Sequence, residues 1–141
     1  MEEIIKEKIS ADHLLYVSLK YTKTCDVILN LISRWKNMID KGLDRLIEKA
    51  KKEKKWKPVP DAPKAKIIQL KRIYANKKDV MDAIELYDLF RDMDKLEKVR
   101  ENEFRKGVNL RVSYRGEEIN INLLKLKDYA AILEKFISSI K

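Results

Sequence analysis

The sequence predicts a mostly α-helical fold, a bundle of four or five helices with one antiparallel β-hairpin before the C-terminal helix. Apolar residues recur at steps of three and four over most of the chain, which is the spacing of a buried helix face. Three prolines fall together in a proline-rich elbow at residues 57–63, and residues 108–123 alternate apolar with polar side chains. A length of 141 residues fits a single helical domain over residues 1–141.

The longest expected helix covers residues 10–55. Two neighbouring rows of apolar side chains run along it at helical spacing, and together they form a face wider than one partner helix covers. Excess apolar surface on a small bundle often marks an interface, so we expect this face to contact a second subunit or another helical protein. Gly42 lies inside the pattern and marks an expected kink or break. The expected interface residues are Leu14, Tyr21, Ile28, Leu31, Trp35 and Met38.

The elbow separates this helix from shorter ones. Proline and the residue before it both disfavour helical geometry, so the chain should turn sharply at the elbow. A short helix is expected at residues 64–75. The next helix should open near Asn76 and carry apolar residues from Val80 to Val99, and Gly107 is placed to end it.

The hairpin has a self-consistent register. With the turn centred on Arg115 and Gly116, all apolar side chains of residues 108–123 fall on one face. Arg115 is a poor first residue for a two-residue primed turn, so a four-residue loop in the same register is favoured. The hairpin must lie against helices, and the last helix is expected at residues 124–140. The expected pairs are Val112–Ile119, Leu110–Ile121 and Val108–Leu123.

The net charge of +9 is unevenly distributed. Residues 1–75 carry 18 basic and 10 acidic side chains, whereas residues 76–141 carry 14 and 13. A concentrated positive field favours nucleic acid or an acidic protein as partner. The alternative is that lysine-rich helices only keep the protein in solution.

A basic run precedes the prolines. Lysines neutralise phosphates without reading sequence, and Trp56 could stack on an unpaired base. The alternative, which we favour, is a solvated helix end with Trp56 folded back onto the bundle. The candidate nucleic-acid-binding residues are Arg45, Lys49, Lys51, Lys52, Lys54, Lys55, Trp56 and Lys57.

Few residues suggest chemistry. His13 is the only histidine and lacks an evident nucleophile or carboxylate partner, so we expect a structural role. Cys25 lies in an apolar row and is expected to be a buried, inert thiol. Asp82, Glu85 and Asp88 form an acidic row, which is expected to be a solvated face rather than a metal site; the alternative is that it docks the basic elbow of the same chain or of a partner. No phosphate loop, zinc-protease motif or nucleophile elbow is present, so we expect no catalytic site, metal or cofactor.

The stretch from Ser10 to Ile32, followed by charged amphipathic helices, resembles small helical proteins of archaea that remain uncharacterised. More distantly it resembles the HEPN class of helical bundles, whose ribonucleases carry an arginine followed after a short spacer by a histidine. This chain departs from that motif, because no arginine precedes His13 and the first arginine is Arg34. The resemblance therefore implies an inactive, dimerising or nucleotide-associated helper rather than a nuclease.

The expected function is a non-enzymatic, self-associating helical interaction module. The alternative is sequence-independent binding of nucleic acid, RNA in the first place, through the basic elbow. Residues 1–10 mix charged and apolar groups and give no sign of a signal peptide, and no apolar run approaches the ~18 residues of a membrane span. We therefore expect a cytoplasmic protein without a membrane partner.

Overall fold

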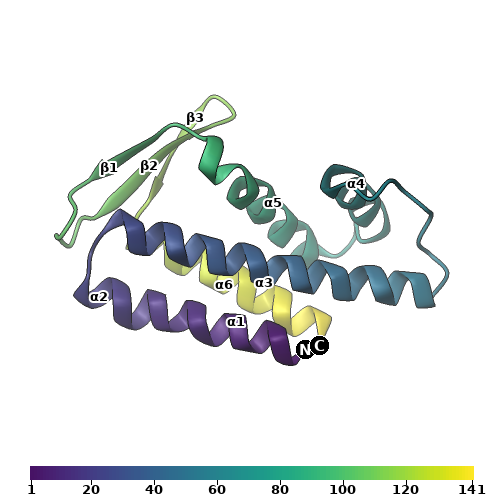
Figure 1. Ribbon diagram of the computed structural model, residues 1–141. Coiled ribbons are helices and arrows are strands. Elements are labelled where there is room, and N and C mark those ends of the chain that lie inside the picture. Colours follow the sequence, from purple (N-terminus) through teal and green to yellow (C-terminus); the bar gives the residue numbers. More distant parts are fainter.

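The computed structural model describes all residues, Met1–Lys141, and shows a mostly α-helical chain with a three-stranded antiparallel sheet ahead of the last helix (Figure 1). This confirms the predicted fold class. The helical elements are α1 (Glu2–His13), a π-helical segment (Leu14–Ser18), α2 (Leu19–Tyr21), α3 (Cys25–Lys52), α4 (Pro63–Ile73), α5 (Lys78–Asp92), a 3₁₀ turn (Met93–Lys95) and α6 (Leu123–Ile140). The strands are β1 (Lys98–Glu101), β2 (Asn109–Tyr114) and β3 (Glu117–Ile121).

Helix α1 lies along α3, and α5 packs against α3 and α6 on the opposite side of α3 from α1 (Figure 1). An aromatic cluster joins three helices. The ring of Phe90 on α5 lies 6.1 Å from that of Trp35 on α3 and 5.7 Å from that of Tyr129 on α6. Because all three rings are buried, this cluster fixes α3, α5 and α6 relative to one another.

The predicted continuous helix over residues 10–55 is wrong. The chain is helical from Glu2 to Tyr21 and then leaves the helical conformation at Thr22. Thr24 is extended, and its hydroxyl accepts a hydrogen bond from the Val27 N–H, so it caps the start of α3. A straight helix over 10–55 would be about 69 Å long. The fold instead lays α1 back along α3, where each covers the apolar face of the other.

This reversal covers the wide apolar face within one subunit. Ile28, Leu31, Trp35 and Met38 are at most 3% exposed. They belong to the core and are not on the surface, which corrects the premise that this face needs a second subunit. Leu14 is half-buried, and of the six residues only Tyr21, at 78% exposed, points freely into solvent.

Gly42 does not interrupt α3, contrary to expectation. A Cβ atom at this position would lie 2.6 Å from Cε2 of Phe136, whose side chain is fully buried. The absence of a side chain therefore allows α6 to approach α3 closely.

The helix predicted to reach Val99 is shorter than expected. α5 ends at Asp92, and after the 3₁₀ turn the chain forms β1, which pairs antiparallel with β2 and adds a third strand to the predicted hairpin. The Lys98 ammonium group donates hydrogen bonds to the carbonyl groups of Met93 and Leu96, so this side chain folds back onto the 3₁₀ turn that follows α5. Gly107 lies in the loop between β1 and β2 and does not end a helix.

The predicted register of the hairpin is confirmed for two pairs, Leu110–Ile121 and Val112–Ile119. The predicted pair Val108–Leu123 lies outside the ladder, since Leu123 is the first residue of α6. The preference for a four-residue loop was wrong, because Tyr114 pairs directly with Glu117 across a two-residue turn. Arg115 and Gly116 both have positive φ, as a type I′ turn requires, and the Arg115 guanidinium lies over the ring of Tyr114.

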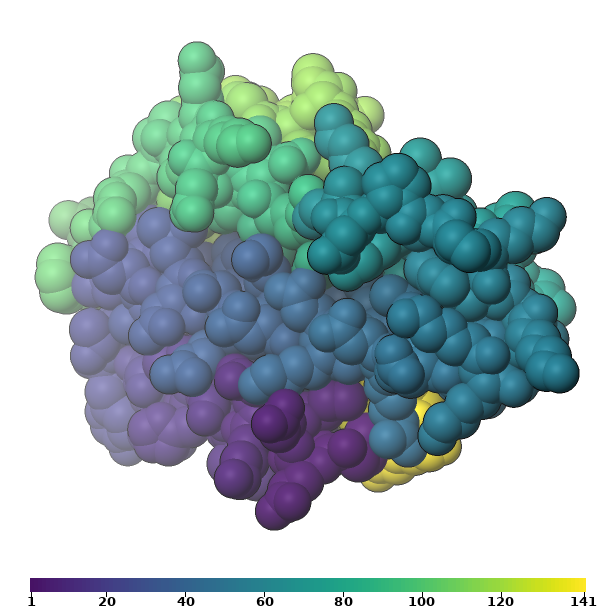
Figure 2. Space-filling view, turned by 45° about the vertical axis from the view of Figure 1, so that its right-hand side comes forward, coloured from purple at the N-terminus to yellow at the C-terminus, as the bar shows by residue number.

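The elbow follows α3 as predicted, and Pro63 occupies the first turn of α4. Trp56 is half-buried against the core. The Tyr74 hydroxyl donates a hydrogen bond to the Leu46 carbonyl of α3, so α4 folds back over the end of that helix, as the teal and blue surfaces of Figure 2 show. None of the helices combines the length and the apolar character needed to cross a membrane.

Candidate functional site

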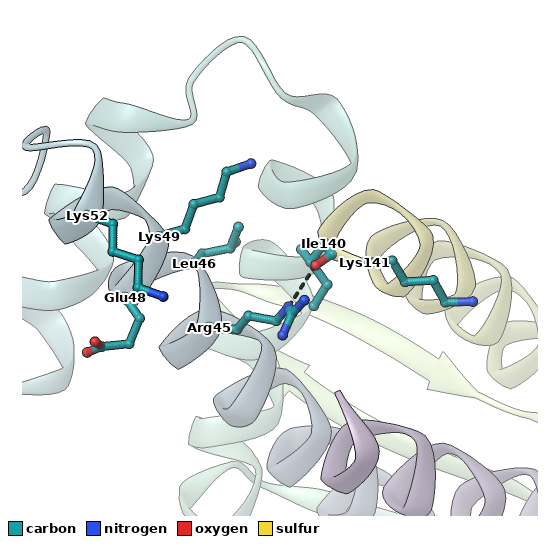
Figure 3. Close-up of a pocket in the computed structure, with 7 residues that line it drawn as sticks. All are labelled: Arg45, Leu46, Glu48, Lys49, Lys52, Ile140 and Lys141. Carbon is teal, nitrogen blue, oxygen red and sulfur yellow. Dashed lines mark hydrogen bonds between the residues drawn. The ribbon is translucent and has the colours of Figure 1, made fainter.

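A hollow opens between the C-terminal ends of α3 and α6, beside the elbow (Figure 3). It has a volume of about 510 Å³. We call it the elbow hollow. Its lining residues are Arg45, Leu46, Glu48, Lys49, Lys52, Ile140 and Lys141.

The charges of the elbow hollow are predominantly positive. The Arg45 Nε donates a hydrogen bond of 2.9 Å to the Ile140 carbonyl, which anchors the guanidinium between the two helix ends (Figure 3). Glu48 is the one acidic side chain in the lining, and its carboxylate points away from Ile140 and lies 3.7 Å from the Lys51 ammonium. Lys49 and Lys52 form no ion pair, so their charges remain available to an anion.

The structure divides the predicted basic run. Arg45, Lys49 and Lys52 line the elbow hollow. Lys51 and Trp56 line a neighbouring depression that also contains acidic side chains, Asp44, Glu48 and Asp61. The rest of the run is exposed around the turn that ends α3, and there Lys55 pairs with Glu53 whereas Lys54 and Lys57 are unpaired.

Trp56 does not stand free among the lysines. It packs against the core and is only partly exposed, which is the arrangement of the alternative that folds it back onto the bundle. A base could not stack on both faces of this ring. Partial burial therefore leaves less of the Trp56 ring open to stacking than the sequence alone suggested.

The acidic row on α5 pairs with cations outside the elbow. Asp88 lies 3.6 Å from the Lys71 ammonium of α4, and Asp82 accepts a hydrogen bond of 2.8 Å from Lys78 one turn earlier. No group of three or more histidine, cysteine, aspartate or glutamate side chains lies close enough together to hold a metal ion. The row is thus partly used to hold α4 against α5.

Two further residues singled out from the sequence have ordinary surroundings. His13 is exposed, and its Nδ1 lies 3.5 Å from the Ser18 hydroxyl. Cys25 is buried as predicted, its thiol lies 3.4 Å from the Asn109 carbonyl, and burial raises the pKa of this thiol. A raised pKa disfavours the reactive thiolate form.

A second hollow escaped sequence analysis. It has a volume of about 490 Å³ and lies where the π-helical segment, the loop between β1 and β2, and the first turns of α6 meet. We call it the apolar hollow. Its lining residues are Leu15, Tyr16, Leu19, Lys20, Lys23, Lys106, Val108, Leu123 and Lys127. These segments are far apart in the sequence, and the only local signal was the closeness of Lys20 and Lys23 to two tyrosines.

The fold and these two hollows define a mostly α-helical protein with two basic depressions on its surface. Comparison with protein-family models, with curated proteins and with solved structures finds no match. Its function is therefore inferred from the chemistry of its own surface.

Proposed function

We propose that this protein is a non-enzymatic interaction module that binds single-stranded RNA without reading its sequence. The binding surface is the end of α3 and the start of the elbow, and its lysines are called the elbow lysines, Lys49, Lys52, Lys54 and Lys57. The observation that carries the proposal is a group of four unpaired lysines at the end of α3, of which Lys49 and Lys52 line a hollow whose only carboxylate faces elsewhere. Lys54 and Lys57 continue this group around the turn.

The chemistry of the elbow supports backbone binding rather than base recognition. Lysine is a compact point charge that attracts phosphate, whereas bidentate base recognition is a property of arginine. Arg45 is the arginine of this surface, and its Nε is already bonded to the Ile140 carbonyl. A flexible single strand can follow such a depression with its phosphates and release counterions as it binds.

The test is the binding of a fluorescent 20-nucleotide oligouridine, measured by anisotropy at 0.1 M salt. Replacement of Lys49, Lys52, Lys54 and Lys57 by Gln should weaken binding by about 600-fold, because four phosphate contacts to a single strand contribute nearly three decades at this salt concentration. The slope of log affinity against log salt should fall by about 2.8.

A matched variant separates a local site from overall charge. Lys36, Lys95, Lys125 and Lys135 form no ion pair and line neither hollow, so their replacement by Gln removes the same charge elsewhere. This control should bind the oligonucleotide within about threefold of the unaltered protein. Equal losses in both variants, or no binding by the unaltered protein, would contradict the proposal.

Self-association is a second candidate function, and a different surface favours it. The outer side of the α1–α2 rod exposes Ile9, Tyr16, Val17 and Tyr21, of which Ile9 and Tyr16 are two helical turns apart. A second copy could cover these side chains in place of the core residues first expected at an interface. Sedimentation equilibrium should then show a dimer that Ile9→Lys dissociates, and a strict monomer at high concentration would rule it out.

A further inference from the structure

The apolar hollow has a floor of aliphatic side chains. Leu15, Leu19 and Val108 are each at most 3% exposed, yet all three line it, and Leu123 extends the floor at 39% exposed. Tyr16 contributes the one aromatic ring to the lining. Apolar atoms that remain in contact with solvent at the bottom of a depression favour a ligand with an apolar part.

The rim of this hollow is entirely cationic. Lys20, Lys23, Lys106 and Lys127 are its only ionisable side chains apart from the phenol of Tyr16, and no carboxylate lines it. None of these lysines takes part in an ion pair. The Lys23 ammonium donates a hydrogen bond to the Lys20 carbonyl, and the Lys20 ammonium lies over the ring of Tyr21. A ligand of this hollow should therefore carry negative charge.

The walls are fixed by contacts that reach across the chain. The Phe104 N–H donates a hydrogen bond of 2.6 Å to the Lys23 carbonyl, and the Cys25 N–H donates one of 3.0 Å to the Glu103 carboxylate. Phe104 has a φ of +66°, an uncommon conformation for a bulky residue that these contacts maintain. The opposite wall is the π-helical segment, and such wider turns are frequent at functional sites.

We propose that the apolar hollow binds a small amphipathic anion, an unbranched aliphatic chain that ends in a carboxylate. The chain would lie on the floor formed by Leu15, Leu19 and Leu123, and the carboxylate would be neutralised at the lysine rim. The volume of about 490 Å³ is that of a small-molecule site. This assignment concerns a different surface from the elbow and does not depend on RNA binding.

Two other ligand classes fit the hollow less well. A phosphate backbone gains nothing from an aliphatic floor, and stacked bases need flat aromatic platforms, of which the lining has only Tyr16. An acidic peptide helix needs an extended groove that accepts side chains over several turns. This hollow is compact, and both its floor and its rim are complete within one subunit.

Isothermal titration calorimetry with decanoate, below the concentration at which it forms micelles, tests the assignment. Decanoate should bind at one site per chain. 1-Decanol has the same tail without the charge and should bind at least about 10-fold more weakly, and so should butyrate, which has the charge without the tail. Equal affinity for decanoate and decanol would overturn the proposal, because it would show that the lysine rim is not used.

Variants and chemical shifts locate the site. Lys23→Gln with Lys127→Gln should weaken decanoate binding at least about 10-fold, and Leu123→Asn should weaken it through the floor. The matched pair Lys36→Gln with Lys135→Gln should leave it unchanged. In the unaltered protein, decanoate should shift the methyl resonances of Leu15, Leu19, Val108 and Leu123, which requires no variant to fold.

Shifts confined to other methyl groups would overturn the assignment, and so would equal losses in the matched pair. Oligouridine provides the remaining comparison. Displacement of decanoate by oligouridine, together with weaker RNA binding by the Lys23 and Lys127 variant, would show that the hollow belongs to a nucleic-acid surface instead. Loss of RNA binding on replacing the elbow lysines, with decanoate binding intact, would support two separate sites.

Discussion

The two hollows lie at opposite ends of α6, an 18-residue helix that is about 27 Å long. Their volumes are about 510 and about 490 Å³, and each is lined by four cationic side chains. They differ in what lies between the charges. The elbow hollow has two aliphatic residues, Leu46 and Ile140, beside a guanidinium anchored to the Ile140 carbonyl, whereas the apolar hollow has four, Leu15, Leu19, Val108 and Leu123. Because size and charge are alike, we expect the floor of each depression to decide which anion it selects.

The largest expected difference between the two hollows is in how strongly salt weakens the binding of their ligands. If four phosphates contact the elbow, raising the salt concentration from 50 to 200 mM should weaken oligouridine binding by about 50-fold, because counterions then compete with each contact. Decanoate binding should change less than about threefold, since one carboxylate is neutralised and the tail contributes through an apolar contact that salt does not screen. Anisotropy and calorimetry at the two salt concentrations measure these changes.

The proposed difference between the two hollows would be contradicted if salt weakened the binding of both ligands equally. A steep loss of decanoate binding would mean that charge dominates at the apolar hollow and that its leucines are incidental. A flat response of oligouridine would mean that the elbow lysines do not contact phosphates.

The aromatic cluster around Tyr129 lies on α6 between the two hollows. Its stability should therefore contribute to the fold on which both hollows depend. Burial raises the pKa of Tyr129 to about 12, because the phenolate form is disfavoured away from water. With an unfolded-state pKa of about 10, the stabilisation is complete below pH 10 and is lost as pH rises towards 12. Between pH 8 and pH 11 the loss from this group should be about 1.4 kcal/mol.

Tyr129→Phe is the matched variant, since it keeps the ring and removes the ionisable hydroxyl. Urea unfolding at pH 8 and pH 11 should show that the unaltered protein loses about 1.4 kcal/mol more than Tyr129→Phe does. Other tyrosines are present in both proteins and cancel in the difference. An equal loss of stability in both proteins would show that folding does not raise the pKa of Tyr129, and therefore that its hydroxyl is not kept from water in the folded protein.

Sequence patterns predicted the helices and the β-hairpin better than they predicted where elements end. The register of β2 against β3 followed from alternation, because a slip by one residue would have exposed Leu110 and Ile121. The break at Thr22 was missed, because apolar spacing continues across it in step with the helical repeat. β1 was missed because a four-residue edge strand offers too few positions to distinguish alternation from a helix.

Some features of the candidate sites could likewise be predicted from the sequence, and others could not. The elbow lysines are contiguous in the sequence, so their clustering was visible there, whereas their ion pairs with Glu48 and Glu53 were not. The apolar hollow combines residues from Leu15 to Lys127, and only the folded chain brings them together. Burial of Trp35 likewise depends on α5 and α6, which the pattern of α3 alone does not reveal.

The smallest expected effect comes from the helix cap at the start of α6, which should change only the apolar hollow. The Asn122 side chain accepts a hydrogen bond of 2.9 Å from the Lys125 N–H and so caps the helix whose first turns contribute Leu123 and Lys127 to the apolar hollow. Asn122→Ala should cost about 1 kcal/mol of stability, and Asn122→Ser should cost much less because serine can also cap. Urea unfolding of the three proteins measures both effects.

Loss of this cap should also weaken decanoate binding by about threefold, because a frayed first turn no longer holds Leu123 and Lys127 in place, while oligouridine binding at the other end of α6 should not change. The cap lies at the opposite end of the helix from Ile140, so the elbow contact between Arg45 and that carbonyl group is left intact. Equal weakening of both ligands would mean that α6 transmits the change along its whole length and that the two hollows are coupled rather than independent.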